Sequence, residues 1–118
     1  MSCDVMVLDD EPLIRELLTE ALAGAGLSAC EAGTGRAMRV ILREGGARLL
    51  VADKKLAEGE DGHVLAREAM RLNPGLLVVY ISGHVDAMGD AGLTPRERFL
   101  PKPFTASTLV ELAQALIR

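Results

Sequence analysis

The sequence predicts an α/β protein built on a parallel β-sheet with helices on both faces. Short, continuous apolar runs alternate with longer segments in which apolar residues recur every three or four positions. The runs lack a polar alternation, which indicates strands that are buried on both faces. Several runs are followed closely by a carboxylate, a hydroxyl or an amine, and in a parallel sheet such residues meet at the carboxyl edge of the strands. The same pattern therefore predicts both a fold and a site.

The composition indicates one acidic domain with an aliphatic core. Of the 118 residues, 49% are apolar and 3% aromatic, and we expect residues 1–118 to form one domain. The net charge of −4 argues against direct binding of nucleic acid, which favours a basic surface. No apolar run approaches the roughly 20 residues that cross a bilayer, and acidic residues interrupt the N-terminal stretch. We therefore expect a cytoplasmic domain without membrane contact, in which Cys3 and Cys30 are small buried thiols, with a disulfide as the less favoured alternative.

The strands are expected where the apolar runs occur. They are placed at residues 5–8, 27–31, 49–53, 76–81 and 99–100. The run at residues 76–81 is the clearest, and the run at residues 27–31 is the weakest. Because a segment with helical spacing separates each run from the next, the strands are expected to be parallel.

Five helices are expected to alternate with these strands. The first follows Pro12, which the first turn of a helix tolerates, and Asp10 and Glu11 are possible caps. Residues 84–97 contain two glycines and a proline, and they predict only a short or frayed fourth helix. The other helices are expected at about residues 34–44 with Thr34 as the cap, at residues 63–72, and after Thr105 or Ser107 as the cap.

A group of polar side chains is expected to meet at one edge of this sheet. Each member follows a predicted strand: Asp9, Asp10, Asp53, Ser82 and Lys102. Carboxylates supply the oxygen ligands that Mg²⁺ prefers, while a lysine and a hydroxyl can bind phosphoryl oxygens. Taken singly, each residue has an ordinary explanation as helix N-terminal charge, a turn residue or a solvated lysine. Their joint occurrence predicts a magnesium-assisted phosphoryl site.

Five short motifs then carry a resemblance to a known family. They are VLDDEP at residues 7–12, VAD at 51–53, DG at 61–62, ISG at 81–83 and FLPKPF at 99–104. No single motif is specific, but together and in this order they resemble the response-regulator receiver domain of two-component signalling, from Val5 to Ile117. The resemblance implies the flavodoxin-like (βα)5 fold with strand order 2-1-3-4-5, which the alternation of elements alone leaves open.

The resemblance also implies the chemistry of the site. Asp53 would be the phosphoacceptor, whose carboxylate attacks a phosphoryl group to form an acyl phosphate. Asp10 and Asp53 would bind Mg²⁺ directly, Asp9 would bind it through water, and Lys55 would contribute its backbone carbonyl. The metal would neutralise charge where two anions must meet.

The same resemblance implies how a signal leaves the site. Lys102 and Ser82 would each bind one phosphoryl oxygen, and the movement of Ser82 would let Phe99 rotate inward. The surface formed by the fourth helix, fifth strand and fifth helix would then change. The phosphoryl donor would be a phosphohistidine on a histidine kinase or a histidine phosphotransfer protein, and the output would be a downstream protein partner. We expect a signalling phosphoacceptor with slow self-dephosphorylation at most, and not an enzyme.

The loop after Asp53 departs from most members of the family. It is one residue longer, and it has Leu56 and Ala57 where an apolar residue and a proline are usual. This form resembles the C-terminal receivers of hybrid histidine kinases, so either a stand-alone regulator or a domain of a larger kinase is compatible with the sequence.

Two other functions remain as alternatives. An α/β phosphatase with Asp53 as nucleophile would usually carry a second carboxylate two residues later, where this chain has Lys55. A binding module that uses the fold without phosphorylation is disfavoured, because every expected chemical residue of the site is retained. Turnover of a phosphomonoester would favour the first alternative, and partner binding that is indifferent to Asp53→Asn would favour the second.

Overall fold

The computed structural model describes residues 2–56, 59–83 and 93–117, and these form one parallel sheet flanked by helices. The five strands have the order β2-β1-β3-β4-β5, and all four pairings are parallel. The strands are β1 (Cys3–Leu8), β2 (Ala29–Ala32), β3 (Ala47–Asp53), β4 (Leu77–Ser82) and β5 (Glu97–Pro101). This order confirms the predicted (βα)5 architecture, in which β1 and β3 are neighbours at the point where strand order reverses.

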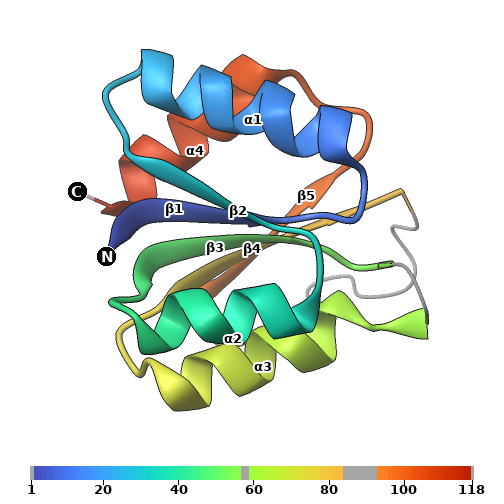
Figure 1. Cartoon of the computed structure of the whole chain (residues 1–118). Coiled ribbons are helices and arrows are strands. Elements are labelled where there is room, and N and C mark those ends of the chain that lie inside the picture. The colour runs from blue at the N-terminus through green and yellow to red at the C-terminus, as the bar shows by residue number, and fades with distance from the viewer. Residues whose placement is uncertain (1, 57–58, 84–92, 118) are drawn as a thin grey trace.

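Four helices cover the two faces of the sheet in the described part of the chain. They are α1 (Pro12–Gly24), α2 (Gly35–Arg43), α3 (Gly62–Leu72) and α4 (Ala106–Ile117). In Figure 1, α1 and α4 lie on one face of the sheet, and α2 and α3 lie on the other. The short helix expected within residues 84–97 falls largely on residues 84–92, which lie outside the described residues. The final helix of the sequence prediction is therefore α4.

The helix starts follow the predicted caps in most cases. Thr34 caps α2, because its hydroxyl accepts a hydrogen bond of 3.1 Å from the Ala37 N–H. The Thr105 hydroxyl accepts a hydrogen bond of 3.2 Å from the Thr108 N–H, so Thr105 is the cap of α4. Glu11 is the N-cap residue of α1, but its side chain makes no capping bond. Here the Asp9 carboxylate accepts from the Glu11 N–H at 2.9 Å.

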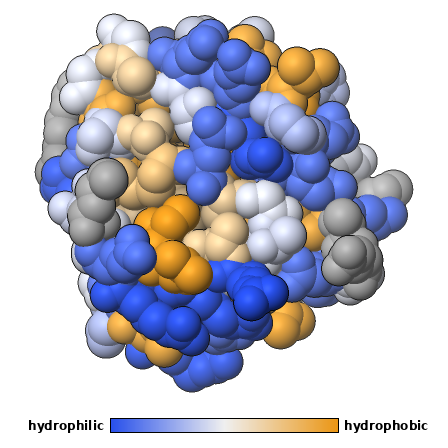
Figure 2. Space-filling model, viewed as in Figure 1, coloured by the Kyte–Doolittle hydropathy of each residue, from blue (hydrophilic) through white to orange (hydrophobic). Residues whose placement is uncertain are grey.

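The core has one layer on each face of the sheet, as the two-residue period of a strand requires. On β1, Met6 and Leu8 pack on the side of α2 and α3, whereas Val5 and Val7 pack on the side of α1 and α4. All four are at most 1% exposed, so β1 is buried on both faces as predicted, whereas the edge strands β2 and β5 have exposed and half-buried positions. From the viewpoint of Figure 2, hydrophilic residues cover most of the lower surface, over α2 and α3.

The prediction of two unpaired thiols was wrong. Cys3 on β1 and Cys30 on β2 form a disulfide, with their Cα atoms 6.3 Å apart. Both residues pack against the core on the side of α2 and α3, and β1 and β2 are adjacent parallel strands. The two cysteines meet because these strands are adjacent, and their separation of 27 residues in the sequence does not predict that contact.

Among the described residues, no helix has the length and apolar character needed to cross a membrane.

Candidate functional site

The three predicted carboxylates form one cluster at the carboxyl edge of the sheet. Asp9 and Asp10 follow β1, and Asp53 ends β3, whose residue Ala52 is in register with Leu8 of β1. One carboxylate oxygen from each of the three aspartates lies within 4.8 Å of the other two. Asp9 is 2% exposed and Asp53 is 7% exposed, so charge repulsion between them is poorly screened by water.

Asp9 shows the electrostatic cost of this arrangement. Burial, opposed by the hydrogen bond from the Glu11 N–H and reinforced by the charge of Asp53, raises the pKa of Asp9 to about 6. A divalent cation among the three carboxylates would reverse this cost, because it stabilises their ionised forms. An all-oxygen donor set is also the chemistry that Mg²⁺ prefers, so the residues present fit a magnesium ion.

The Asp53 carboxylate is held at both oxygens. Lys102 Nζ lies 3.0 Å from Oδ2, and the Lys55 N–H donates to Oδ1 at 3.1 Å. Lys102 reaches this position from the end of β5, where its own N–H donates to the Ser82 carbonyl at 2.9 Å and its peptide bond to Pro103 is cis. Burial of the Lys102 amine lowers its pKa, but the hydrogen bond and the charge of Asp53 outweigh burial, and the net pKa is raised.

Ser82 completes the group at the end of β4. Its neighbour Ile81 is in register with Asp53, and Ser82 itself is 3% exposed. Ser82, Lys55 and Lys102 line one pocket together with Asp10 and Asp53. The structure therefore brings together the site residues that the sequence predicts; their roles are taken up under the proposed function.

Phe99 does not line this pocket, but it lies on the same face of the sheet as Ser82. It is half-buried on β5, packs against the core on the side of α2 and α3, and is in register with Tyr80 of β4. Tyr80 and Ser82 are two residues apart on β4, so their side chains face the same side of the sheet. Phe99 and Ser82 thus share one face.

The loop between β3 and α3 explains why a glycine follows Asp61. Lys55 and Asp61 form an isolated antiparallel bridge, and the Gly62 N–H donates to the Lys54 carbonyl at 2.8 Å. A Cβ atom at Gly62 would lie 1.9 Å from the Asp53 carbonyl oxygen, a distance that requires the backbone to move. The sequence identified this pair of residues as a motif, and the structure gives the reason: only glycine allows the loop to close on the backbone of Asp53.

The sequence analysis did not predict a buried polar network centred on Glu97 of β5. Glu97 of β5 is 2% exposed; it accepts hydrogen bonds from Tyr80 of β4, from Arg67 of α3 at 2.9 Å and from the Thr94 N–H at 2.9 Å. Burial would raise the pKa of Glu97, but these bonds, that from Tyr80 foremost, lower it to about 2. The ring of His63 packs edge-on against Tyr80, with centroids 5.1 Å apart. No periodic signal marks these residues, because their partners come from three separate elements.

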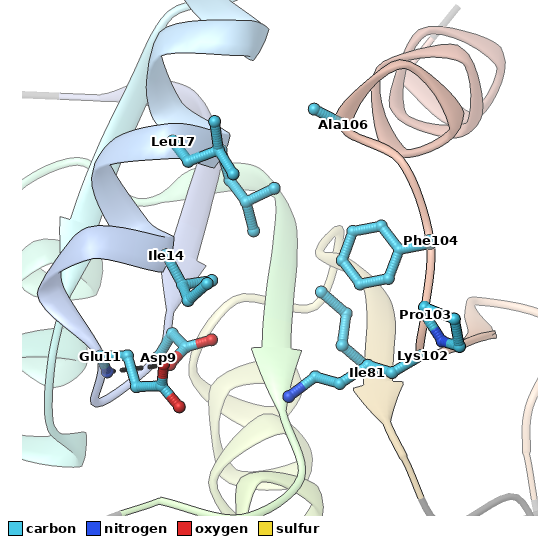
Figure 3. A pocket seen from close by; sticks show the side chains of 10 residues that line it. Asp9, Glu11, Ile14, Leu17, Ile81, Lys102, Pro103, Phe104 and Ala106 are labelled. Atoms are coloured by element: carbon cyan, nitrogen blue, oxygen red, sulfur yellow. Dashed lines mark hydrogen bonds between the residues drawn. The ribbon is translucent and has the colours of Figure 1, made fainter.

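A cleft of about 500 Å³ opens beside the acid cluster, between α1 and the connection from β5 to α4. Figure 3 shows Phe104 of that connection across the cleft from Ile14 and Leu17 of α1, with Asp9 and Lys102 at the same end. The walls are mainly aliphatic and aromatic. The acid cluster therefore borders an apolar surface on α1.

Comparison with known proteins agrees with this geometry. The sequence model described as Response regulator receiver domain matches residues 5–114. The chain is 32% identical over 117 residues to the DNA-binding transcriptional regulator NtrC of Salmonella typhimurium, covering 96% of this chain and 24% of NtrC. It is 31% identical over 116 residues to the response regulator receiver protein CpdR of Brucella abortus, covering 96% of each chain.

Solved structures of receiver domains share the fold. The crystal structure of the receiver domain of NtrX from Brucella abortus superposes with a TM-score of 0.84 and 30% identity, covering 97% of this chain and 98% of that one. The chain spans about a quarter of the length of NtrC, so the remainder of NtrC has no counterpart in these residues. By the sequence match, the strand order and the structural likeness, the chain belongs to the response regulator receiver family of two-component signalling proteins.

Proposed function

We propose that residues 1–118 form one receiver domain that accepts a phosphoryl group on Asp53. The observation that carries this proposal is the position of the Asp53 carboxylate, which lies among two other carboxylates on one side and the Lys102 amine on the other. A carboxylate in this setting has a metal site to screen its charge and a fixed cation to receive a phosphoryl oxygen. Membership in the receiver family supports the same role.

Mg²⁺ is the proposed cofactor. Asp10 and Asp53 would bind it directly, Asp9 would bind it through water, and Lys55 would contribute its backbone carbonyl, since it lines the same pocket as Asp10 and Asp53. When bound, the ion supplies the positive charge that allows an anionic phosphoryl donor to approach an anionic acceptor. The protein supplies the orientation: the Lys55 N–H and Lys102 hold the two oxygens of the acceptor carboxylate.

The proposed reaction is a phosphoryl transfer from phosphohistidine. One oxygen of Asp53 forms a bond to phosphorus as the bond between phosphorus and the imidazole nitrogen breaks. The imidazole leaves with that electron pair and takes up a proton from solvent. Lys102 binds one oxygen of the transferred group, and the Ser82 hydroxyl donates to another. The product is an acyl phosphate that water hydrolyses slowly, so the domain acts as a signalling phosphoacceptor and not as an enzyme.

The proposed output is a change of the surface around β5. Movement of Ser82 toward the phosphoryl group makes room on the face of the sheet that Phe99 shares, and Phe99 rotates into it. The affected surface comprises β5, α4 and the segment before β5. A downstream protein partner would read that surface, in the cytoplasm, without direct contact with nucleic acid or membrane by this domain. An origin in a hybrid histidine kinase stays a prediction.

The experiment is intact-mass measurement after incubation with acetyl phosphate, with and without Mg²⁺. The wild-type protein should gain one phosphoryl group only when Mg²⁺ is present, and Asp53→Asn should gain none. Mg²⁺ alone should also stabilise the fold, by about 2.7 kcal/mol at a hundredfold excess over its dissociation constant. Asp10→Ala should lose that stabilisation.

The alternatives give different results in the same assay. Continuous release of phosphate from a phosphomonoester would indicate a phosphatase. Failure of both acetyl phosphate and a phosphohistidine donor to modify the protein, together with no Mg²⁺ binding, would indicate a receiver fold used only for protein binding.

A further inference from the structure

Arg15 joins the turn that carries Asp9 and Asp10 to the edge of the sheet. It lies on the first turn of α1, but its side chain is only 19% exposed. Its Nη1 donates to the Asp9 carbonyl oxygen at 2.7 Å, and its Nε donates to Oε1 of Glu31 on β2 at 3.2 Å. One guanidinium group therefore connects the turn after β1 with the edge strand of the sheet.

The carbonyl that Arg15 holds belongs to the peptide bond between Asp9 and Asp10. Because this peptide unit is planar, fixing its oxygen fixes its N–H and the direction in which the chain enters Asp10. The Asp9 N–H is held as well, by the Ala32 carbonyl at 3.1 Å, and the Asp9 side chain is held by the Glu11 N–H. Arg15 therefore supplies the side-chain contact that fixes the backbone between Asp9 and Asp10, and with it the relative positions of their carboxylates.

Neighbouring residues fit the guanidinium closely. Glu31 orients it through the ion pair, and Gly33 gives it room, since a Cβ at Gly33 would lie 2.9 Å from Nη1. A shorter, uncharged side chain such as glutamine could not span both the Asp9 carbonyl and the Glu31 carboxylate.

We propose that Arg15 is a positioning residue for the metal site: through the Asp9 carbonyl it sets the placement of the Asp9–Asp10 pair and thereby the affinity of the three-carboxylate cluster for Mg²⁺. This inference rests on the proposed function, in which the cluster binds Mg²⁺. Outer-shell contacts of this kind typically change metal affinity by roughly 10–100-fold when removed. Arg15 itself touches neither the metal nor the phosphoryl group.

The test is titration calorimetry of the folded protein with Mg²⁺ alone. Arg15→Gln should weaken Mg²⁺ binding by roughly 10–100-fold. Arg15→Lys, which keeps hydrogen-bond donors but places them all on one nitrogen and cannot form the fork to both Asp9 and Glu31, should recover part of the loss. Glu31→Gln, which leaves the arginine but weakens its orientation, should show a smaller loss in the same direction.

Arg39→Gln is the matched control. It makes the same change of charge and breaks an ion pair of 2.6 Å with Glu68 on the surface of α2 and α3, away from the acid turn. It should bind Mg²⁺ with wild-type affinity. Melting curves without metal show which variants fold, and if Arg15→Gln does not fold, Glu31→Gln carries the test.

A second measurement separates positioning from general damage. The rate of phosphorylation by acetyl phosphate is followed as a function of Mg²⁺ concentration. Arg15→Gln should need more Mg²⁺ for its half-maximal rate but approach the wild-type rate at saturation. Wild-type affinity in both Arg15→Gln and Glu31→Gln would overturn the inference while leaving the proposed function in place, whereas no Mg²⁺ binding by the wild-type protein would overturn both.

Discussion

Lys102 at the end of β5 contacts Asp53 at the end of β3 across the whole width of β4, with 3.0 Å between Nζ and Oδ2. The two residues are separated by 49 positions in the sequence. Their contact depends on the parallel order of β3, β4 and β5, which ends all three strands at one edge. The lysine therefore already contacts the Asp53 carboxylate in the unphosphorylated protein.

Removal of this amine should separate metal binding from signalling. Lys102→Ala should lower the free energy of unfolding of the metal-free protein by more than the roughly 1 kcal/mol of an exposed pair, because it leaves the buried Asp53 carboxylate without its cation. Mg²⁺ affinity should be largely retained, since the three carboxylates remain. The change in the NMR spectrum around Phe99 on phosphorylation should be lost. Arg98→Ala, which removes an exposed cation from β5, the strand just before Lys102, is the control. A wild-type spectral response in Lys102→Ala would contradict the role given to the lysine.

Gly62→Ala should disturb Asp53, the proposed phosphoacceptor, directly. The new Cβ would lie 1.9 Å from the Asp53 carbonyl oxygen, so either the loop or the end of β3 must move. We expect a loss of about 1–3 kcal/mol or more in urea unfolding, together with slower phosphorylation. Gly24→Ala is the control, because no atom lies within 4 Å of its Cβ position in α1, and it should stabilise the fold by about 0.5–1 kcal/mol. Equal stability of the two variants would show that a Cβ at position 62 does not clash with the Asp53 carbonyl oxygen.

The Glu97 network predicts a loss of stability in acid. The pKa of Glu97 is about 2 in the folded protein, against 4.5 as its ordinary value. The folded state therefore holds the ionised form, so this contribution is present above pH 4.5 and is lost as the pH falls toward 2. It amounts to roughly 2–4 kcal/mol at neutral pH. Glu97→Gln should lower stability at pH 7 and flatten the acid limb of the curve from urea unfolding.

Glu68→Gln is the comparison for that experiment. Glu68 pairs with Arg39 on the surface, where its side chain is 28% exposed, and its removal should cost less than about 1 kcal/mol. If Glu97→Gln and Glu68→Gln had the same effect at pH 7 and at pH 3, the buried network would not have the energy that its geometry implies.

Asp9 predicts the opposite dependence on pH in the absence of metal. Its pKa of about 6 is above the ordinary value of 3.8, so the folded state prefers the protonated form. Stability from this group is complete below pH 3.8 and is lost as the pH rises through about 6. Asp9→Asn should therefore stabilise the metal-free protein at pH 8 by roughly 1–3 kcal/mol.

Thermal unfolding with and without Mg²⁺ tests this point. Saturating Mg²⁺ should reduce or reverse the advantage of Asp9→Asn, because the wild-type site then gains binding energy that the variant lacks. Glu16→Gln removes an exposed carboxylate from α1 and should show neither effect. An Asp9→Asn protein that is less stable than wild type without metal at pH 8 would contradict the burial argument.

Much of the fold and the site could be predicted, because both depend on one rule of parallel sheets. Apolar runs located the five strands, and residues just after them had to lie at the same edge. For that reason Asp9, Asp53 and Lys102 could be grouped before any coordinates were known. The strand order itself came from the resemblance to receivers, since alternation of strands and helices does not fix it.

The features that were missed depend on which elements become neighbours. Cys3 and Cys30 meet only because β2 lies beside β1. Glu97 is paired only because α3 and β4 place Arg67 and Tyr80 within hydrogen-bond distance of it. Arg15 is one of several charged residues in its helix, and nothing in the periodicity distinguishes it from a solvated side chain. Sequence spacing predicts where an element ends, but not which side chain of the next element will contact it.

The measurement that most directly tests the central claim is chemical mapping of the phosphoryl group. The protein is incubated with Mg²⁺ and acetyl phosphate, and borohydride is added to reduce the acyl phosphate to an alcohol. Peptide mass mapping then identifies the reduced residue. We predict reduction at Asp53 alone, dependent on Mg²⁺, with no labelling in Asp53→Asn. Labelling of Asp9, Asp10 or another carboxylate in place of Asp53, or acid-labile modification of a histidine, would contradict the assignment of Asp53 as the phosphoacceptor.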